Sequence, residues 1–159
     1  MKSAILTVVA ALSMLGFQAL AADWEADFAQ AQARAAREGT FLLVDFSGSD
    51  WCGWCIKLDK EVFSKAEFQA YAKDKLVLAL VDFPRKTLLP EKAAAANKAL
   101  ASKYKVEGFP TVILMLPDGT EVARTGYQEG GPVAYVAHLK ELLTPHQGKL
   151  PKPAAAATK

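Results

Sequence analysis

The sequence predicts an α/β domain whose central mixed sheet of about four strands is flanked by helices. Apolar runs of strand length alternate with segments of helical pattern, which is typical of parallel strands joined by helices. Late in the chain, Pro117-Asp118-Gly119 separates two strand patterns, and Asp-Gly favours a tight hairpin that adds an antiparallel strand. The length of 159 residues, with 52% hydrophobic and 23% charged residues, suits one globular domain with its own core.

Residues 1–21 are expected to form a signal peptide that is not part of the domain. Lys2 precedes an apolar run at 4–15, and Ala19-Leu20-Ala21 fits a small-residue cleavage site, so cleavage is expected after Ala21. An uncleaved membrane anchor is the alternative, but the run is short and is soon followed by polar residues. The protein is therefore expected in the periplasm or outside the cell. At the other end, residues 147–159 have too little apolar content to fold and are expected to form a disordered tail.

The domain is expected to span residues 22–146 and to begin with a helix and a buried strand. Asp23 is a suitable N-cap and Gly39 a suitable stop for a helix over 23–38. Within it, apolar residues recur at helical spacing at Trp24, Phe28, Ala31 and Ala35. The run 40–46 is almost continuously apolar and predicts a strand covered on both faces, with Asp45 as its one charged residue.

A second helix is expected to start at Cys52 and to turn a stripe formed by Cys55, Leu58 and Val62 inward. Ser64 and Glu67 form a capping-box pattern. We therefore expect a helix break near Phe63 and a new helix from Lys65 to about Lys73.

The rest of the domain continues the alternation. Strands are predicted at 76–83, 111–116 and 121–125, and an alanine-rich helix at 91–104. The segment 84–97 is longer than such a fold needs, and it either shapes partner choice or is an extended surface loop followed by a longer helix. Pro132 suits the first turn of a last helix, which Pro145 ends and which buries Val136, Leu139 and Leu143.

The stretch Trp51-Cys52-Gly53-Trp54-Cys55 holds the only two cysteines and lies where a strand ends and a helix begins. Free N–H groups and the helix dipole at a helix N-terminus favour negative charge, which lowers the pKa of a thiol there. Cys52 is therefore the expected nucleophile towards a disulfide, and Cys55, one turn further on, the thiol that resolves the mixed disulfide. Trp54 is expected to form an apolar rim that docks substrate chains; for Trp51, the rim and packing over the loop both remain open.

With these motifs the sequence resembles the thioredoxin superfamily. The resemblance covers about 41–143 and rests on Val44-Asp45-Phe46, on the WCGWC stretch and on Gly108-Phe109-Pro110-Thr111. The common family motif has Gly-Pro between the cysteines, whereas this chain has Gly53-Trp54. In this it resembles exported thioredoxin-like proteins with WCxWC motifs, some of which reduce periplasmic disulfides.

The resemblance implies a thioredoxin fold and further site residues. Asp45 would lie buried beneath the cysteines and assist proton transfer, although the loop to Cys52 is one residue longer than in thioredoxin. Phe109-Pro110 would be a cis peptide facing the cysteines, and with Thr111 it would pair with an extended substrate segment. No cofactor is expected, because the Cys52–Cys55 disulfide is itself the redox group. A membrane redox partner would recycle the protein, and we expect it to act as a monomer.

Other functions fit the sequence less well. The disulfide could be purely structural, in a thioredoxin-fold binding or chaperone module, but a four-residue loop yields only about 2 kcal/mol of stabilisation. Zinc would need His138 and His146, which the predicted fold does not bring to the cysteines. Ile56 stands where covalent haem attachment needs histidine, and a net charge of +2 without a basic cluster gives no support for nucleic-acid binding. A dedicated reductase for cytochrome maturation remains an alternative within the enzymes.

Overall fold

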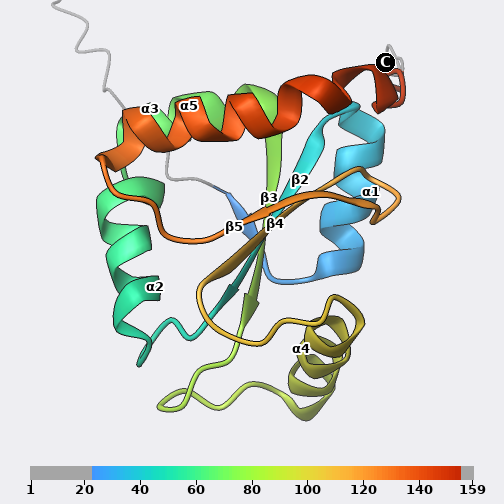
Figure 1. The fold of residues 1–159 in the computed structure, drawn as a ribbon. Helices are drawn as coiled ribbons and strands as arrows, with labels where there is room; N and C mark the ends of the chain where they lie inside the picture. Colours follow the sequence, from blue (N-terminus) through green and yellow to red (C-terminus); the bar gives the residue numbers. More distant parts are fainter. Residues whose placement is uncertain (1–22, 155–159) are drawn as a thin grey trace, which may run out of the picture.

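The computed structural model describes residues 23–154, which form one five-stranded mixed sheet between two layers of helices (Figure 1). The sheet order is β1-β3-β2-β4-β5. β1 pairs with β3 and β3 with β2 in parallel, whereas β4 is antiparallel to both β2 and β5. This confirms the predicted α/β class and mixed sheet, with one short strand more than four. The strands are β1 (Trp24–Glu25), β2 (Phe41–Ser47), β3 (Leu76–Asp82), β4 (Thr111–Met115) and β5 (Glu121–Thr125).

The helices cover opposite faces of the sheet, and successive residues of β2 show which face is which. Leu43 packs with α3 (Ala66–Lys75) and α5 (Gly131–Leu143), as well as with the segment that follows the cysteines. That segment consists of α2 (Gly53–Leu58) and a π-helical turn (Asp59–Phe63). Leu42 and Val44 point the other way and pack with α1 (Phe28–Glu38) and the end of α4 (Glu91–Lys103). The alternation follows from the two-residue period of a strand.

The first helix begins at Phe28, four residues after Trp24, where a helix capped by Asp23 would begin. Asp27 is the N-cap, because its carboxylate accepts the N–H groups of Ala29 and Gln30 at 2.9 and 3.2 Å. Trp24 instead pairs with β3 and packs on Phe63 across the sheet from α1, with ring centroids 5.1 Å apart. The helical spacing of Trp24 with the apolar face of α1 was therefore coincidental.

The break in the helix that follows the cysteines is confirmed near Phe63, but no capping box forms there. Lys65 is the N-cap of α3 and makes no side-chain cap bond, while the Ser64 hydroxyl donates back to the Lys60 carbonyl at 3.2 Å. Ser64 keeps a right-handed helical backbone, so its hydroxyl reaches the preceding turn rather than the next one. The predicted inward stripe is confirmed, since Cys55, Leu58 and Val62 are all buried.

The later elements begin and end within one residue of the predicted positions. Residues 147–154, which the sequence places in a disordered tail, follow a defined course in the structure. A 3-10 helix (Thr144–Lys149) leads to Leu150, which packs against the core, and the Ala154 N–H donates to the Arg37 carbonyl at 2.9 Å. The predicted signal peptide and residues 155–159 lie outside the described residues. Within 23–154, no helix combines the length and the apolar character needed to cross a membrane.

Candidate active site

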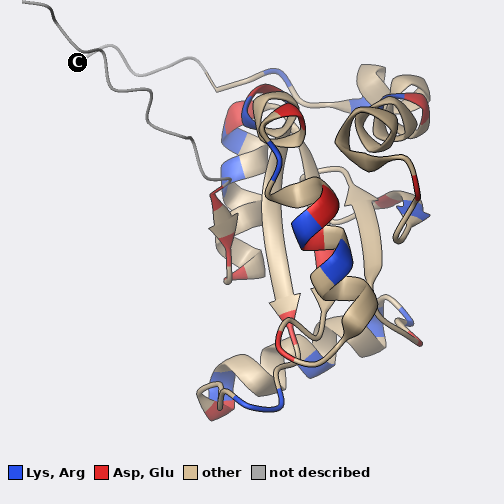
Figure 2. Ribbon diagram, turned by 90° about the vertical axis from the view of Figure 1, so that its left-hand side faces the viewer, with Lys and Arg blue, Asp and Glu red and all other residues tan. Residues whose placement is uncertain are grey.

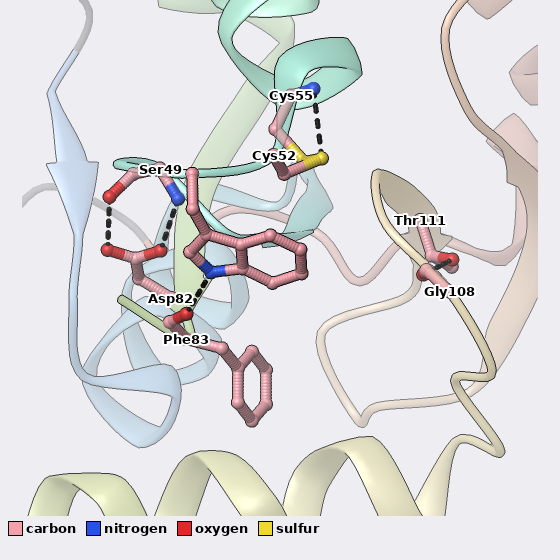
Figure 3. Close-up of a disulfide and its surroundings, with 8 residues drawn as sticks. Ser49, Cys52, Cys55, Asp82, Phe83, Gly108 and Thr111 are labelled. Atoms are coloured by element: carbon pink, nitrogen blue, oxygen red, sulfur yellow. Dashed lines mark hydrogen bonds between the residues drawn. A yellow bond between two sulfur atoms is a disulfide. The ribbon is translucent and has the colours of Figure 1, made fainter. Parts of the chain in front are cut away.

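The two cysteines form a disulfide at the start of α2, directly after the loop that leaves β2 (Figure 3). Cys52 is the N-cap residue with an extended backbone, and its Sγ accepts the N–H of Cys55 at 3.2 Å. Cys52 is 7% exposed and Cys55 is 4% exposed. In the reduced protein the same N–H group and helix terminus would stabilise a thiolate on Cys52, as the sequence predicts.

The segment 108–111 reaches the cysteine motif through the contact of Phe109 with Trp51, and it carries the predicted cis peptide, which is confirmed at Phe109–Pro110. The Thr111 hydroxyl closes the turn by donating to the Gly108 carbonyl at 2.7 Å. The Phe109 ring meets the indole of Trp51 edge-on, with centroids 6.0 Å apart. Two motifs more than fifty residues apart in the sequence are thus brought together through the neighbours of Cys52 and Pro110.

The two tryptophans of the motif have different surroundings. Trp51 is partly buried, donates from Nε1 to the Phe83 carbonyl at 2.7 Å and carries the Arg85 guanidinium 3.6 Å from its ring centroid. Trp54 is 56% exposed. Its ring lies 5.3 Å from that of Tyr127. The structure therefore packs Trp51 within the loop and leaves Trp54 on the surface, while Gly53 between the cysteines is exposed.

Asp45 lies in the interior of β2, behind the cysteines. It is 5% exposed, and its Oδ1 has no hydrogen-bond partner within the part of the chain that the structure describes. Together with Cys55 it lines a cavity of about 230 Å³. Burial, followed by the negative charges of Asp82 and Asp59, raises the pKa of Asp45 to about 7. The extra loop residue before Cys52 therefore does not remove Asp45 from the site.

A second group of contacts, which sequence reasoning missed, joins the cysteine loop to the segment after β3. The Asp50 carboxylate accepts the N–H groups of Arg85, Lys86 and Thr87 at 2.7 to 3.2 Å. These bonds, that of Arg85 above all, lower the pKa of Asp50. No spacing in the sequence signals these bonds, because their partners lie 35 to 37 residues apart.

The carboxylate of Asp82 ties down the same loop. It accepts the N–H and the hydroxyl of Ser49 at 2.9 and 2.6 Å (Figure 3). The Asn97 side chain donates to the backbone carbonyl of Asp82 at 2.8 Å. The longer segment 84–97 thus holds the cysteine loop directly, through the N–H groups that bind Asp50, and indirectly, through the bond from Asn97 to Asp82.

Tyr127 was also missed by sequence reasoning, and it completes the exposed side of the site. Its hydroxyl donates to Glu61 at 2.6 Å, and the Lys57 ammonium lies over the rings of both Tyr127 and Trp54.

Acidic and basic positions are interspersed along the helices, whereas the central strands are almost free of charge (Figure 2). Within residues 23–154, no three or more His, Cys, Asp or Glu side chains are grouped to hold a metal ion.

Comparison with known proteins places this site in a family. Residues 28–141 match the profile of a thioredoxin-like domain. The chain is 37% identical over 120 residues to "Disulfide bond reductase DsbH" of Chlamydia pneumoniae, covering 76% of this chain and 72% of that protein. A solved structure described as "DsbH Oxidoreductase" superposes with a TM-score of 0.75 at 32% identity, over 90% of this chain and 95% of that one. A thioredoxin from Thermus thermophilus shares the fold with a TM-score of 0.58 at 19% identity, over 77% of this chain and 88% of that one. The chain belongs to the thioredoxin-like family.

Proposed function

We propose that this protein is a thiol–disulfide oxidoreductase of the cell envelope that acts mainly as a reductant of protein disulfides. The observation that carries the proposal is the redox-capable pair Cys52–Cys55 at a helix start, beside the Phe109–Pro110 turn. The similarity to a protein named a disulfide bond reductase supports the direction.

The reaction needs only the two thiols of the reduced protein. The Cys52 thiolate attacks one sulfur of a substrate disulfide, which forms a mixed disulfide and releases the other substrate sulfur as a thiolate. Cys55 then loses its proton and attacks the Cys52 sulfur. The Cys52–Cys55 bond forms, the bond to the substrate breaks, and the second substrate sulfur leaves. The substrate disulfide is reduced by two electrons and the cysteine pair is oxidised by two.

Asp45 is proposed as the acceptor of the Cys55 proton. Both residues line one cavity, and a carboxylate whose pKa is about 7 is close to half ionised at neutral pH. The proton therefore has a nearby acceptor that can return it to solvent before the next cycle.

Substrate chains are proposed to dock between the exposed Trp54 and the turn before β4. Trp54 offers an apolar ring, and Thr111 begins β4 directly after Pro110. An extended substrate backbone would pair beside Phe109 and Thr111, while Gly53 leaves the approach to Cys52 free of a side chain. Trp51, bonded to the Phe83 carbonyl, would support Phe109 rather than contact substrate first.

Turnover requires a partner that returns electrons to the oxidised pair. A membrane-bound electron donor on the outer side of the cytoplasmic membrane fits the predicted signal peptide and a periplasmic location. We propose that the protein meets this donor and its substrates as a monomer, without a further cofactor.

The proposal is tested by trapping covalent intermediates. Cys55→Ser should accumulate mixed disulfides with envelope proteins, because nothing resolves them, whereas Cys52→Ser should form none and lose turnover. The adducts should disappear on non-reducing gels after dithiothreitol treatment. Adducts from Cys52→Ser but not from Cys55→Ser would refute the assigned roles.

A binding or chaperone module with a structural disulfide is the competing function. The low exposure of Cys52, at 7%, is the observation in its favour. In that case neither single-cysteine variant would form adducts, and both would retain binding of unfolded chains.

A further inference from the structure

The cavity next to Cys55 connects buried groups with exposed ones. Asp45, Ser47 and Cys55 on its lining are buried, whereas Ser49 and Asp59 are exposed. At about 230 Å³ it has room for several water molecules with polar partners. It therefore provides a route for a proton between the Cys55 thiol and solvent.

Nothing in the sheet neutralises the carboxylate at the inner end of this route. Asp45 is opposite Leu80 of β3 and Val112 of β4, which are both apolar. The charged groups that act on it are Asp82 at the end of β3 and Asp59 at the start of the π-helical turn. Both are carboxylates.

The remaining element that faces Asp45 contributes a neutral group. Burial, and then the charge of Asp45, raise the pKa of Tyr135 on α5, whose hydroxyl donates to the Gly126 carbonyl at 3.2 Å. Tyr135 therefore stays protonated and supplies no positive charge. Cys55 also lines the cavity, and it carries a thiol proton only in the reduced protein.

Asp82 and Asp59 differ in what holds their carboxylates. Both oxygens of Asp82 accept hydrogen bonds from Ser49. The Asp59 carboxylate, at the exposed rim of the cavity, makes no side-chain hydrogen bond within the described part of the chain. The charge of Asp82 raises the pKa of Asp45 more than that of Asp59 does, but of the two only Asp59 lines the cavity and lies on the path to solvent.

We propose that Asp59 is a positioning residue for the resolving step, which through its charge at the cavity mouth keeps Asp45 able to bind and release the proton of Cys55. The proposal rests on the proposed function. During resolution the proton passes from the Cys55 thiol to Asp45, the Cys52–Cys55 bond forms, and the substrate sulfur leaves with the electron pair of the broken bond. The negative charge of Asp59 raises the pKa of Asp45, which favours transfer of the proton from Cys55. Asp45 then releases the proton through the cavity, past Asp59, to solvent.

Removal of the Asp59 charge has a predictable sign. A nearby negative charge raises the pKa of a carboxyl, so Asp59→Asn should lower the pH at which Asp45 ionises. The expected shift is about half a pH unit, the size of one charge acting through a partly hydrated cavity. The pH range over which the resolving rate rises should shift to lower pH by the same amount.

The test uses two readouts of the whole chain. Titration of the Asp45 carboxyl carbon by NMR in the oxidised protein reports the coupling itself, whether or not the protein turns over. The release of the second thiol from a disulfide-linked model peptide, measured against pH in a single turnover, reports the resolving step. Asp59→Glu keeps the charge and should restore both midpoints, while Glu67→Gln removes an exposed carboxylate outside the cavity and should change neither.

The outcomes separate this proposal from the proposed function. Shifts of both midpoints in Asp59→Asn, absent in Asp59→Glu and Glu67→Gln, support it. The proposal is overturned if the Asp45 titration midpoint is unchanged in Asp59→Asn, or if Glu67→Gln shifts it by the same amount. It is also overturned if the Asp45 midpoint shifts while the pH dependence of the resolving rate does not. If the parent protein shows no peptide reduction at all, the proposed function fails, and the proton route for resolution fails with it even where the NMR midpoint moves.

Discussion

Asp45 is the residue at which stability and chemistry oppose one another. A carboxyl whose side chain is 95% hidden from solvent and has an unpaired oxygen is costly to ionise. Its pKa of about 7 in the folded chain lies well above the 3.8 of an exposed aspartate. Below pH 4 the group is protonated in both states. Between pH 4 and 7 the Asp45 carboxyl ionises in the unfolded chain before it does so in the folded one, so the free energy of unfolding falls over this window. Above pH 7 the carboxyl is ionised in both states and causes no further loss of stability.

Asp45→Asn should therefore stabilise the fold at pH 8. The gain should be on the order of 3 kcal/mol, because an amide avoids the cost of a buried charge, and it should shrink towards zero near pH 4. Urea unfolding of the oxidised protein at both pH values measures it. A variant that is equally or less stable at pH 8 would show that Asp45 is not held as described. The same variant should slow the resolving step, which would be the cost of the added stability.

At the scale of elements, the clamp between the cysteine loop and the segment 84–90 joins two loops without any regular structure. Three N–H groups converge on the Asp50 carboxylate, and the Arg85 guanidinium covers Trp51. Because these bonds lower the pKa of Asp50, the clamp is complete at neutral pH and weakens as pH falls through that lowered pKa.

Asp50→Ala should release this loop without unfolding the domain. The amides of Arg85, Lys86 and Thr87 should exchange with solvent at least about tenfold faster, since each loses a charge-assisted hydrogen bond. Asp118→Ala is the matched control, because Asp118 accepts a single N–H, that of Thr120, in the hairpin turn. Hydrogen exchange followed by NMR distinguishes the two. Unchanged exchange at residues 85–87 in Asp50→Ala would mean that the clamp does not hold the loop.

The elements that sequence predicted best are those specified by local pattern. The runs at 76–83 and 111–116 and the Asp118-Gly119 turn carry their own signals, and each lies within one residue of its expected position. The start of α1 was mistaken because Asp23 and Asp27 are equivalent N-caps by type. Pairing of Trp24 with β3, some fifty residues away, decides between them. The capping box failed for a similar reason, since Ser64 is held by the preceding turn.

At the scale of the whole molecule, Phe63 ties the active-site helix to the rest of one core layer. Its ring packs on Trp24 of β1, on Phe68 of α3 and on Tyr135 of α5, with centroids 4.8 to 5.9 Å apart. Phe63 is 2% exposed and also lines the Asp45 cavity. Its packing therefore fixes both the helix that carries the cysteines and the wall behind them.

Phe63→Ala should cost about 3–5 kcal/mol of unfolding free energy, the range for a buried aromatic replaced by a cavity. Val133→Ala, on the exposed side of α5, should cost less than about 0.5 kcal/mol. Both values come from urea unfolding at neutral pH. A cost below about 1 kcal/mol for Phe63→Ala would contradict its role as the link between these elements.

The core of the candidate site was predictable because its residues lie in two short motifs. Cys52, Cys55 and Pro110 were found from the sequence, and the structure shows the disulfide, the cis peptide bond and a ring contact between the preceding residues Trp51 and Phe109. Asp59, Asp82 and Tyr127 were not found, because a single acid or tyrosine carries no signal in the sequence until the fold sets it beside a cavity, a loop or a ring. What sequence missed is therefore the surroundings that adjust the chemistry, rather than the reacting groups.

The reduction potential of the Cys52–Cys55 pair tests the central claim most directly. The mature protein would be equilibrated with glutathione or dithiothreitol buffers, and the oxidised fraction quantified by thiol alkylation. A reductant recycled by an electron donor should give a value near that of thioredoxin, about −270 mV. A value near −120 mV would contradict the reducing direction and indicate an oxidant. A pair that stays oxidised well below about −300 mV would contradict catalysis itself and leave the disulfide a structural one.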